Sequence, residues 1–453
     1  MKRRSAIKTL GAFSLAGMIP SGIASCDGEN ENKKMPQHVT DVLVIGGGTT
    51  GVVAAIQSAR AGCKTILLES GSQLGGTTTT GGVAFPGLFH AWGKQVIAGI
   101  GWELVSEAVA LNGDTLPDFT IPHGRSHWRH QIPLNAPLYT LLAEEKCIQA
   151  GVTLRYYETP VRITCQNDQW LLDVTGKGTQ CRIVCKQLID CTGNALIVSM
   201  AGYNLLRETE NQPGSFIFEL GGYDISTLDT AVLNERFQKA LQDGIILKRD
   251  SSGGGIMGLL RAKGGLGAQY VLNADSTTSE LHTSANIEGR ASMLRILRFV
   301  RTLPGCEKAY IAKMQPETAI RETNRIDGMY QITHEDYVNG TIFEDSLSYS
   351  YYPIDLHSKE GVTPKHLQED VVATVPLRAL IPKGSKNLLA AGRCVSSDRL
   401  ANSALRVQAS CMGMGQAAGA AAALACKKNM TPVNVPIDDI KQLIRSHGGI
   451  IPV

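Results

Sequence analysis

The segment YPIDLH places an aspartate and a histidine two positions apart, at Asp355 and His357. In an extended segment, side chains at this spacing project to the same face, so the carboxylate and the imidazole would face each other. A histidine oriented by a carboxylate can take up or release a proton near neutral pH. A surface or purely structural pair is the alternative interpretation. We therefore predict His357 as a catalytic acid or base, with Asp355 as its partner.

A second charged cluster, RETNRI, brings Arg321, Glu322 and Arg325 together in an otherwise apolar neighbourhood. Arginine stabilises carboxylates and developing oxyanions, so Arg321 is a candidate for holding a substrate. The alternative is an arginine–glutamate ion pair that joins two lobes, and the sequence leaves both interpretations open. Arg399 is a further candidate cation for the same chemistry.

Histidines at His123, His127 and His130 could suggest a metal site. Trp128 and Arg129 intervene and no acidic residue completes the set, so we interpret these histidines as solvated loop residues. The eleven cysteines include no CxxC pair and no Cys/His cluster at zinc spacing. We predict no metal centre.

The elements that position these residues begin with an apolar strand, DVLVI, at residues 41–45. GGGTTG follows, with Gly46, Gly48 and Gly51 at the fixed positions of GxGxxG and Thr50 opening a helix of small residues. A second apolar strand, residues 65–68, ends in Glu69, where a carboxylate can accept hydrogen bonds from ribose hydroxyls. This order predicts a dinucleotide site, because the helix N-terminus favours a pyrophosphate.

Later segments extend this pattern. Ser70 and the small residues Gly75, Gly76 and Thr77 resemble the loop that glutathione-reductase-type flavoproteins run along the pyrophosphate and ribityl chain, which favours FAD over NAD. A helix at 137–150 leads to a strand that would bring Val161 to the adenine edge. An alternating stretch at 162–187 indicates a β-meander. Further contacts are expected in QLIDCTG and NLLAAGRC, before a long alanine-rich helix, at Thr192, Gly193, Gly392 and Arg393.

On these segments the sequence resembles the FAD-dependent oxidoreductase family, a branch of the glutathione-reductase-type flavoproteins that includes many exported bacterial proteins. The resemblance covers nearly all of the chain after its first segment and implies FAD as cofactor. Arg393 stands where many such enzymes carry an acid, so ribityl binding would come from backbone groups or from Asp398. Arg406 would lie near the flavin pyrimidine ring. His90 is the only local candidate for a covalent link, and we expect non-covalent FAD.

The predicted fold class is α/β: a Rossmann-like FAD-binding domain with a central parallel sheet and a β-meander, plus an inserted α+β substrate lobe. A chain of 453 residues exceeds what one hydrophobic core usually supports. We predict a signal peptide, a tether, an FAD-binding domain in two parts around a substrate or cap domain, and a tail, with the boundaries 1–26, 27–38, 39–202, 203–386, 387–430 and 431–453. Within the cap, residues 286–303 have helical periodicity.

The N-terminus has the features of an export signal, with Arg3 and Arg4 before an apolar stretch. Residues Ile23 to Cys26 resemble a bacterial lipobox, so a lipid at Cys26 would be the chain's contact with a membrane. The sequence contains no internal repeat, and no low-complexity tract beyond the tether. The net charge of +3, with no dense Lys/Arg block in the mature region, argues against nucleic acid as a partner. We predict a periplasmic or cell-envelope lipoprotein.

Three functions remain open from the sequence. The leading hypothesis is hydride transfer between FAD and a carbon bearing a hydroxyl in a small polar substrate, which the resemblance implies to be carbohydrate-derived. The second is flavin-dependent reduction of an activated double bond, as in fumarate-reductase-like enzymes, with an arginine as proton donor. The third is an FAD-containing surface lipoprotein with a glycan-binding role. The electron acceptor is not identified.

Overall fold

The sheet that carries the glycine-rich turn has seven strands. The computed structural model describes residues 35–453 except 124, 252–254 and 263–267, so the predicted signal segment and Cys26 lie outside the described residues. The strand order is β5 (Thr153–Tyr156), β2 (Thr65–Glu69), β1 (Gln37–Ile45), β8 (Thr179–Asp190), β7 (Gln169–Gly176) and β6 (Glu158–Gln166). β16 (Leu388–Ala390) also pairs with β8.

Strand β8 joins two kinds of sheet. From residue 182 to its end it pairs parallel with β1, while its first half pairs antiparallel with β7 and its last three residues pair parallel with β16. β5, β2, β1, β8 and β16 are therefore mutually parallel, and β6, β7 and β8 form the meander. The predicted Rossmann-like α/β fold with a parallel sheet and a β-meander is confirmed. The carboxyl ends of the parallel strands meet at one edge, where ligands bind in such sheets.

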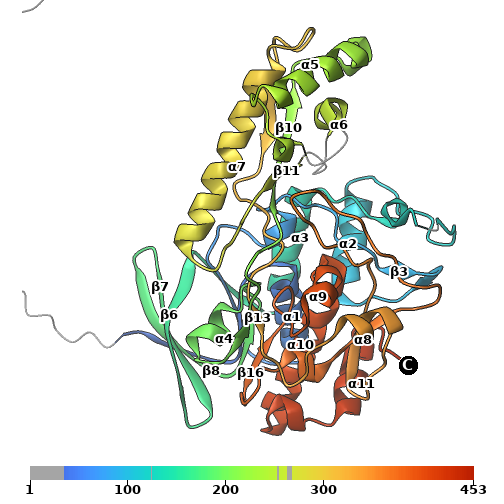
Figure 1. Ribbon diagram of the computed structural model, residues 1–453. Coiled ribbons are helices and arrows are strands. Elements are labelled where there is room, and N and C mark those ends of the chain that lie inside the picture. The colour runs from blue at the N-terminus through green and yellow to red at the C-terminus, as the bar shows by residue number, and fades with distance from the viewer. Residues whose placement is uncertain (1–34, 124, 252–254, 263–267) are drawn as a thin grey trace, which may run out of the picture. The chain divides into compact units, whose positions relative to one another are not determined.

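Two helices pack closely on each other beside this sheet. α1 (Thr49–Arg60) follows β1 directly, and α10 (Gln408–Lys428) follows the last strand (Figure 1). A Cβ on Gly415 would lie 2.4 Å from the carbonyl oxygen of Thr50, and one on Gly419 would lie 2.5 Å from that of Ala54. Glycines one turn apart on α10 thus let the two backbones touch, which explains the glycine- and alanine-rich composition of this helix.

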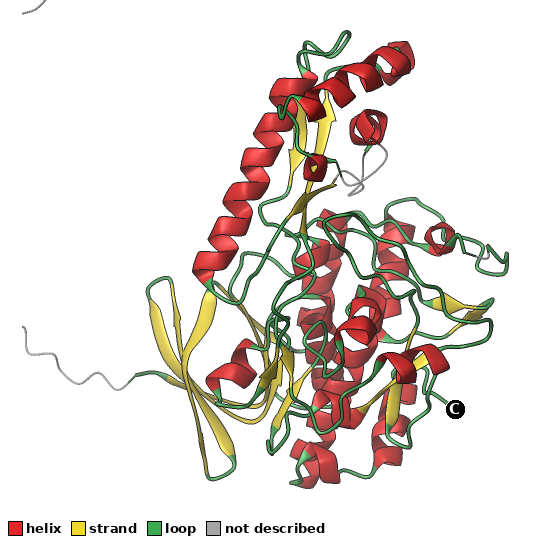
Figure 2. Ribbon diagram, viewed as in Figure 1, coloured by secondary structure: helices red, strands yellow, loops and turns green. Residues whose placement is uncertain are grey.

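A second hydrophobic core forms around a three-stranded sheet with the order β11 (Ala268–Val271), β10 (Gly214–Gly221) and β12 (Tyr310–Met314). The long helix α7 (Ser279–Val300) lies along these strands, with α5 (Thr230–Gln242) and α6 (Gly255–Arg261) nearby (Figure 2). α7 begins seven residues before the predicted helix because the side chain of Thr278 caps it by accepting from the Leu281 amide. The buried residues of this core run from Phe216 to Ile320.

The second core is shorter than the predicted cap at 203–386. Buried residues from Ile332 to Ile381 belong instead to the first core, the cluster of buried side chains around α1 and α10. So do Ile440 and Ile444 of α11 (Ile437–Ser446), within the predicted tail. The other helices are α2 (Ile100–Leu111), α3 (Ala136–Gln149), α4 (Leu196–Met200), α8 (His334–Asn339) and α9 (Arg399–Leu405). The other strands are β3 (His90–Ala91), β4 (Lys94–Gln95), β9 (Leu205–Leu206), β13 (Arg325–Ile326), β14 (Ser346–Ser350) and β15 (Ala373–Pro376).

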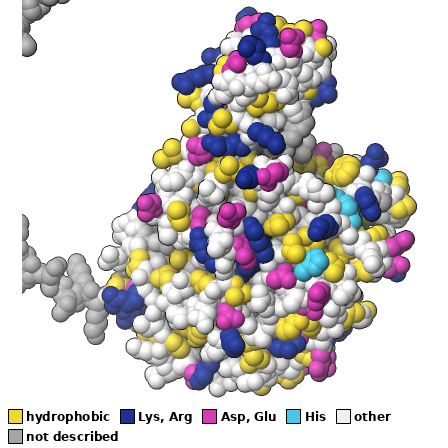
Figure 3. Space-filling view, viewed as in Figure 1, with side chains coloured by type: hydrophobic (Ala, Val, Ile, Leu, Met, Phe, Trp, Pro, Cys, Tyr) yellow, Lys and Arg dark blue, Asp and Glu magenta, His cyan; other side chains and the backbone are white. Residues whose placement is uncertain are grey.

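The described surface gathers no charge of one sign on the face shown in Figure 3, where acidic and basic side chains are interspersed. The ten cysteines in the described part of the chain form no disulfide. Across the same residues, no helix combines the length and the apolar character that crossing a bilayer requires.

Candidate functional site

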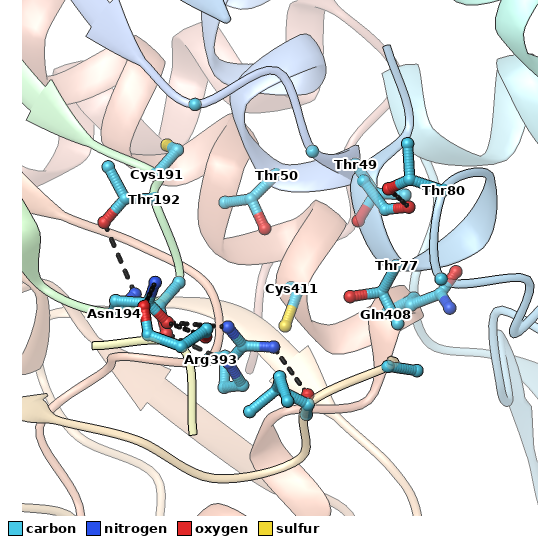
Figure 4. A pocket seen from close by; sticks show the side chains of 18 of the residues that line it. Thr49, Thr50, Thr77, Thr80, Cys191, Thr192, Asn194, Arg393, Gln408 and Cys411 are labelled. Atoms are coloured by element: carbon cyan, nitrogen blue, oxygen red, sulfur yellow. Dashed lines mark hydrogen bonds between the residues drawn. The ribbon is translucent and has the colours of Figure 1, made fainter. Parts of the chain in front are cut away.

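A cavity of about 770 Å³ opens at the carboxyl ends of the parallel strands and continues toward the second core. Figure 4 shows part of it, with side chains from α1, from the turns after β2, β8 and β16, and from α10. Most of the predicted binding residues line it: Gly46, Gly48, Thr50, Glu69, Ser70, Gly76, Thr77, Thr192, Gly193, Arg393 and Arg406. Three of the predicted catalytic residues line it as well: Arg321, Asp355 and His357.

The first turn needs its glycines for different reasons. Gly46 has φ +100°, which side chains rarely adopt, and its Cβ would lie 2.6 Å from the carbonyl oxygen of Cys191. A Cβ on Gly51 would lie 1.8 Å from the Gly46 carbonyl oxygen, so Gly51 serves close packing and does not line the cavity. Gly48 has open space beside it, which leaves room for a ligand at the N-terminus of α1.

The second glycine turn lies directly on the first. The Gly75 amide donates to the Gly47 carbonyl at 2.8 Å, and Gly48 and Gly75 form a parallel bridge. Thr78, at the end of this turn, donates to the side chain of Gln408 in the first turn of α10, and Gln408 in turn donates to Val83 at 2.8 Å. The three loops around the cavity are thus held together by hydrogen bonds.

Glu69 lies where the sequence predicts a ribose-binding acid. Its carboxylate accepts from the amide of Gly47 at 2.7 Å and from that of Gly71 at 2.6 Å. The Ser70 hydroxyl also donates to Oε1 at 3.3 Å, so these bonds fix the carboxylate, and Oε2 keeps a lone pair for a ligand hydroxyl.

The turn after β8 is held by Asp190, which sequence reasoning missed. This buried carboxylate accepts from the amides of Thr192, Ile197 and Val198 at 3.0, 2.8 and 3.1 Å. Burial raises its pKa above the ordinary value, against the lowering effect of these bonds. An acid at the end of the buried strand in QLIDCTG was the available signal.

Arg393 anchors the turn after β16 to the rest of the cavity wall. Its guanidinium donates to the carbonyls of Gly193 at 2.9 Å and Ile320 at 2.6 Å, and to the Asn194 side chain at 3.0 Å. A Cβ on Gly193 would lie 2.9 Å from this guanidinium. Arg393 therefore positions the backbone of the neighbouring turns, in place of the acid that the family pattern usually has here.

Three predicted residues lie elsewhere. Val161 is 58% exposed, because a register shift between Pro160 and Arg162 leaves Glu158, Thr159 and Pro160 facing the cavity instead. Asp398 caps α9 by accepting from the Ala401 amide at 2.8 Å, so it is committed to the helix and not to a ribityl chain. Gly392 has φ +95°, and a Cβ on it would lie 2.7 Å from Thr50 Oγ1. Gly392 therefore allows close packing behind the cavity wall.

Arg399, a predicted catalytic residue, also lies outside the cavity. It pairs with the buried Glu322 at 3.0 Å and donates to the Glu210 carbonyl. Arg325 contacts Glu322 at 3.7 Å. Each of the two interpretations of the RETNRI cluster therefore applies to a different residue. Glu322 forms the structural ion pairs, while Arg321 lines the cavity.

At the outer end of the cavity, Asp355 and His357 meet as predicted. His357 Nε2 lies 3.0 Å from Asp355 Oδ2, and Nδ1 lies 2.9 Å from the hydroxyl of Tyr270. Burial lowers the pKa of His357 to about 4, although the hydrogen bond to Asp355 acts to raise it. Burial acts to raise the pKa of Asp355, but His357 and then Arg406 outweigh it and bring that pKa to about 2. At neutral pH the pair is therefore a carboxylate and a neutral imidazole.

Several residues of this end carried no sequence signal. Tyr352 lines the cavity, and its hydroxyl accepts from Gln131 at 2.8 Å. Burial raises the pKa of Tyr352, so its hydroxyl stays protonated. Tyr270 lies on β11, 87 residues before His357, and only the fold brings them together. His90, the candidate for a covalent link, stacks on Phe119 at 3.7 Å and does not line the cavity.

A family model described as FAD dependent oxidoreductase matches residues 41–444. Among solved structures, the chain is similar to an anhydrotetracycline hydroxylase from Streptomyces rimosus, at 15% identity over 40% of this chain with a TM-score of 0.30. That match spans only 37% of the hydroxylase. A geranylgeranyl bacteriochlorophyll reductase-like protein from Thermoplasma acidophilum matches at 13% identity over 91% of this chain and 83% of its own, with a TM-score of 0.42. A p-nitrophenol 4-monooxygenase from Pseudomonas putida matches at 12% over 90% and 84%, with a TM-score of 0.42.

Proposed function

The chain belongs to the FAD dependent oxidoreductase family, and from this premise we propose that it transfers a hydride between non-covalent FAD and a hydroxyl-bearing carbon of a small polar substrate. When bound, FAD would accept the hydride. The rest of the chemistry falls to the protein: to orient the substrate and to receive the hydroxyl proton.

The cavity residues fit an extended dinucleotide. Gly48 leaves the N-terminus of α1 open to a pyrophosphate, and Oε2 of Glu69 keeps a lone pair for an adenosine ribose. Gly76 and Thr77 line the cavity as well, and α10 begins at the cavity with Gln408 and Cys411 in its first turn. The cavity volume lies within the range of about 300–1,000 Å³ found for small-molecule and cofactor sites.

The observation that carries the proposal is the hydrogen-bonded row from Asp355 through His357 to Tyr270. Asp355 is ionised and accepts from His357 Nε2–H, so Nδ1 is the basic nitrogen and accepts the Tyr270 hydroxyl. In our proposal a substrate hydroxyl displaces that bond and gives its proton to Nδ1. Asp355 then holds the imidazolium that forms, as a carboxylate does behind other catalytic histidines.

Anaerobic spectroscopy of the purified FAD-loaded protein tests this proposal. We expect an alcohol substrate to bleach the oxidised flavin absorbance without any enoate being present. Bleaching by no member of a panel of hydroxy compounds, together with retained FAD, would contradict it. If such a protein also bound glycans, the non-catalytic surface role would be favoured.

A second function is favoured by one observation at Arg321. Burial, and then the charge of Arg406, lower the pKa of Arg321 to about 10. A less basic guanidinium is a better proton donor, as reduction of an activated double bond requires. The same anaerobic absorbance experiment distinguishes the two functions. If the protein is a reductase, an enoate reoxidises the photoreduced flavin, and alcohols do not bleach the oxidised flavin.

A further inference from the structure

The outer end of the cavity contains two guanidinium groups. Arg321 follows the bridge between Ser215 and Ala319 at the edge of the second core, and Arg406 lies between α9 and α10. Both line the cavity. Because these residues belong to different cores, the repulsion between their charges comes from the fold and not from one local motif.

The hydrogen bonds of Arg321 go to neutral groups. Its Nη1 donates to the carbonyl of Pro213 at 2.6 Å and its Nη2 to the hydroxyl of Ser215 at 2.8 Å. The guanidinium also lies 5.4 Å from the centre of the Tyr270 ring. Within the described part of the chain, Arg321 has no carboxylate at ion-pair distance, since its neighbour Glu322 pairs with Arg399 and Arg325.

Arg406 has one carboxylate partner, and that partner is shared. Its Nη2 lies 3.3 Å from Asp355 Oδ2, the same oxygen that accepts from His357. Its Nε is buried and has no hydrogen-bond partner among the described residues. Only Arg406 of the two cations therefore contacts a carboxylate, and Arg321 has none, while His357 and Tyr352 beside them are neutral.

The other ionisable groups of the cavity do not remove this excess of positive charge. Glu317 and Arg393, which also line the cavity, carry opposite charges, and Glu158 pairs with Arg155 at 2.7 Å. Glu69 lies at the glycine-rich turn and is used there. Leaving a buried cation without a counter-charge is costly, and a bound carboxylate would satisfy both guanidinium groups through charge-assisted hydrogen bonds.

We propose that the substrate is a hydroxycarboxylate, whose carboxylate lies between Arg321 and Arg406 and whose hydroxyl faces His357. Asp355 touches both Arg406 and His357, so the anion site and the proton acceptor are one side chain apart. The hydroxyl therefore lies on a carbon next to, or one removed from, the carboxylate. The proposal rests on the proposed function for its reaction: the carbon loses a hydride to FAD, the hydroxyl loses a proton to His357, and a keto acid is formed.

Matched pairs of probes that differ only in charge test the proposal on the FAD-loaded wild-type protein. Lactate is compared with lactamide, and gluconate with gluconamide, by calorimetry and by the change in flavin absorbance on binding. We expect the carboxylates to bind about 10- to 100-fold more tightly than the amides, the factor that charge-assisted hydrogen bonds supply. Equal binding of carboxylate and amide, or no binding of either carboxylate, would overturn the proposal.

Arginine variants then locate the anion. Arg321→Gln should weaken carboxylate binding about 10- to 100-fold and leave amide binding nearly unchanged, and Arg321→Lys should restore part of the loss. Arg182→Gln removes the same charge on strand β8, where Arg182 pairs with Asp173 away from the cavity, and should change neither. Equal weakening of carboxylate and amide by Arg321→Gln would show that the arginine is only structural.

The outcomes separate this proposal from the function on which it rests. Neutral alcohols that bleach the flavin, with no preference for carboxylates in binding, would leave the proposed function standing and end the hydroxycarboxylate proposal. Carboxylates that bind through Arg321 but never bleach the flavin would support the anion site and contradict the oxidation of an alcohol.

Discussion

His357 has a proton affinity set by opposing effects, of which burial is the largest. The Asp355 carboxylate at 3.0 Å favours the protonated ring, while burial and the charge of Arg321 oppose it, and the pKa falls to about 4. The imidazole is therefore a base that stays unprotonated through the whole neutral range. Since the pKa of Asp355 is about 2, His357 is the member of the pair that titrates first as the pH falls.

This environment predicts the pH dependence of the reaction. The rate of anaerobic flavin reduction by substrate should fall as the pH drops through about 4, where His357 becomes protonated, and not near its ordinary value of 6.5. His357→Asn should lower the rate by about 10²- to 10⁴-fold, the usual contribution of a general base, and remove this acid limb. Stopped-flow absorbance measures both effects. His38→Asn, on an exposed part of β1, is the control, and an unchanged acid limb in His357→Asn would contradict the role.

The contact between α1 and α10 connects the glycine-rich turn to the last part of the chain. Gly415 faces the backbone of Thr50, and Thr50 lines the cavity. Strands β1 and β16, which precede these helices, lie on opposite sides of β8. A helix–helix contact at backbone distance thus fixes where the N-terminus of α10 meets the cavity.

Gly415→Ala should destabilise the protein although alanine is the better helix former. Propensity alone would stabilise the helix by about 0.5–1 kcal/mol, but the new Cβ would lie 2.4 Å from the Thr50 carbonyl oxygen and force the helices apart. We expect the free energy of unfolding to fall by about 1–3 kcal/mol, the usual effect of overpacking. Urea unfolding measures it. Gly413→Ala, on the same helix, is the control, because its Cβ would lie 3.1 Å from the Ser348 side chain and should destabilise the protein less. A stabilised Gly415→Ala would contradict the packing argument.

At the scale of the whole molecule, the cavity is lined both by the seven-stranded sheet with its helices and by the second core. The glycine-rich turn and Glu69 lie at the ends of β1 and β2, and Arg406 lies between α9 and α10. Ser215 and Tyr270 lie on the sheet of the second core, and Arg321 follows the bridge from Ser215 to Ala319. A ligand that extends from Glu69 toward Arg321 therefore bridges the two, so its binding energy adds to the stability of the folded chain.

FAD should consequently raise the midpoint of thermal unfolding. At a free concentration of about 100 times the dissociation constant, the gain is about 2.7 kcal/mol. Glu69→Ala should weaken FAD binding about 10- to 100-fold through loss of charge-assisted hydrogen bonds to the ribose, and reduce the shift at a given FAD concentration. Glu235→Ala removes an exposed acid of α5 and should leave the shift intact. A midpoint of thermal unfolding that does not change on addition of FAD would contradict the assignment of the cavity as the FAD site.

The sequence alone determined the cofactor half of this protein. Gly46, Gly48 and Glu69 belong to one strand–turn–helix–strand unit, in which local geometry and short connections dictate which groups point at a ligand. The pairing of Asp355 with His357 was also readable, because two residues of one extended segment share a face.

Only the tertiary structure decided which charged residues line the cavity. Arg321 and Arg399 look equivalent in the sequence, but one faces the cavity and the other pairs with Glu322. Val161 turns away because of a register shift, and Tyr270 meets His357 across 87 residues. Such contacts depend on how separately folded elements pack, and no periodicity within a single element records the direction in which another element will lie.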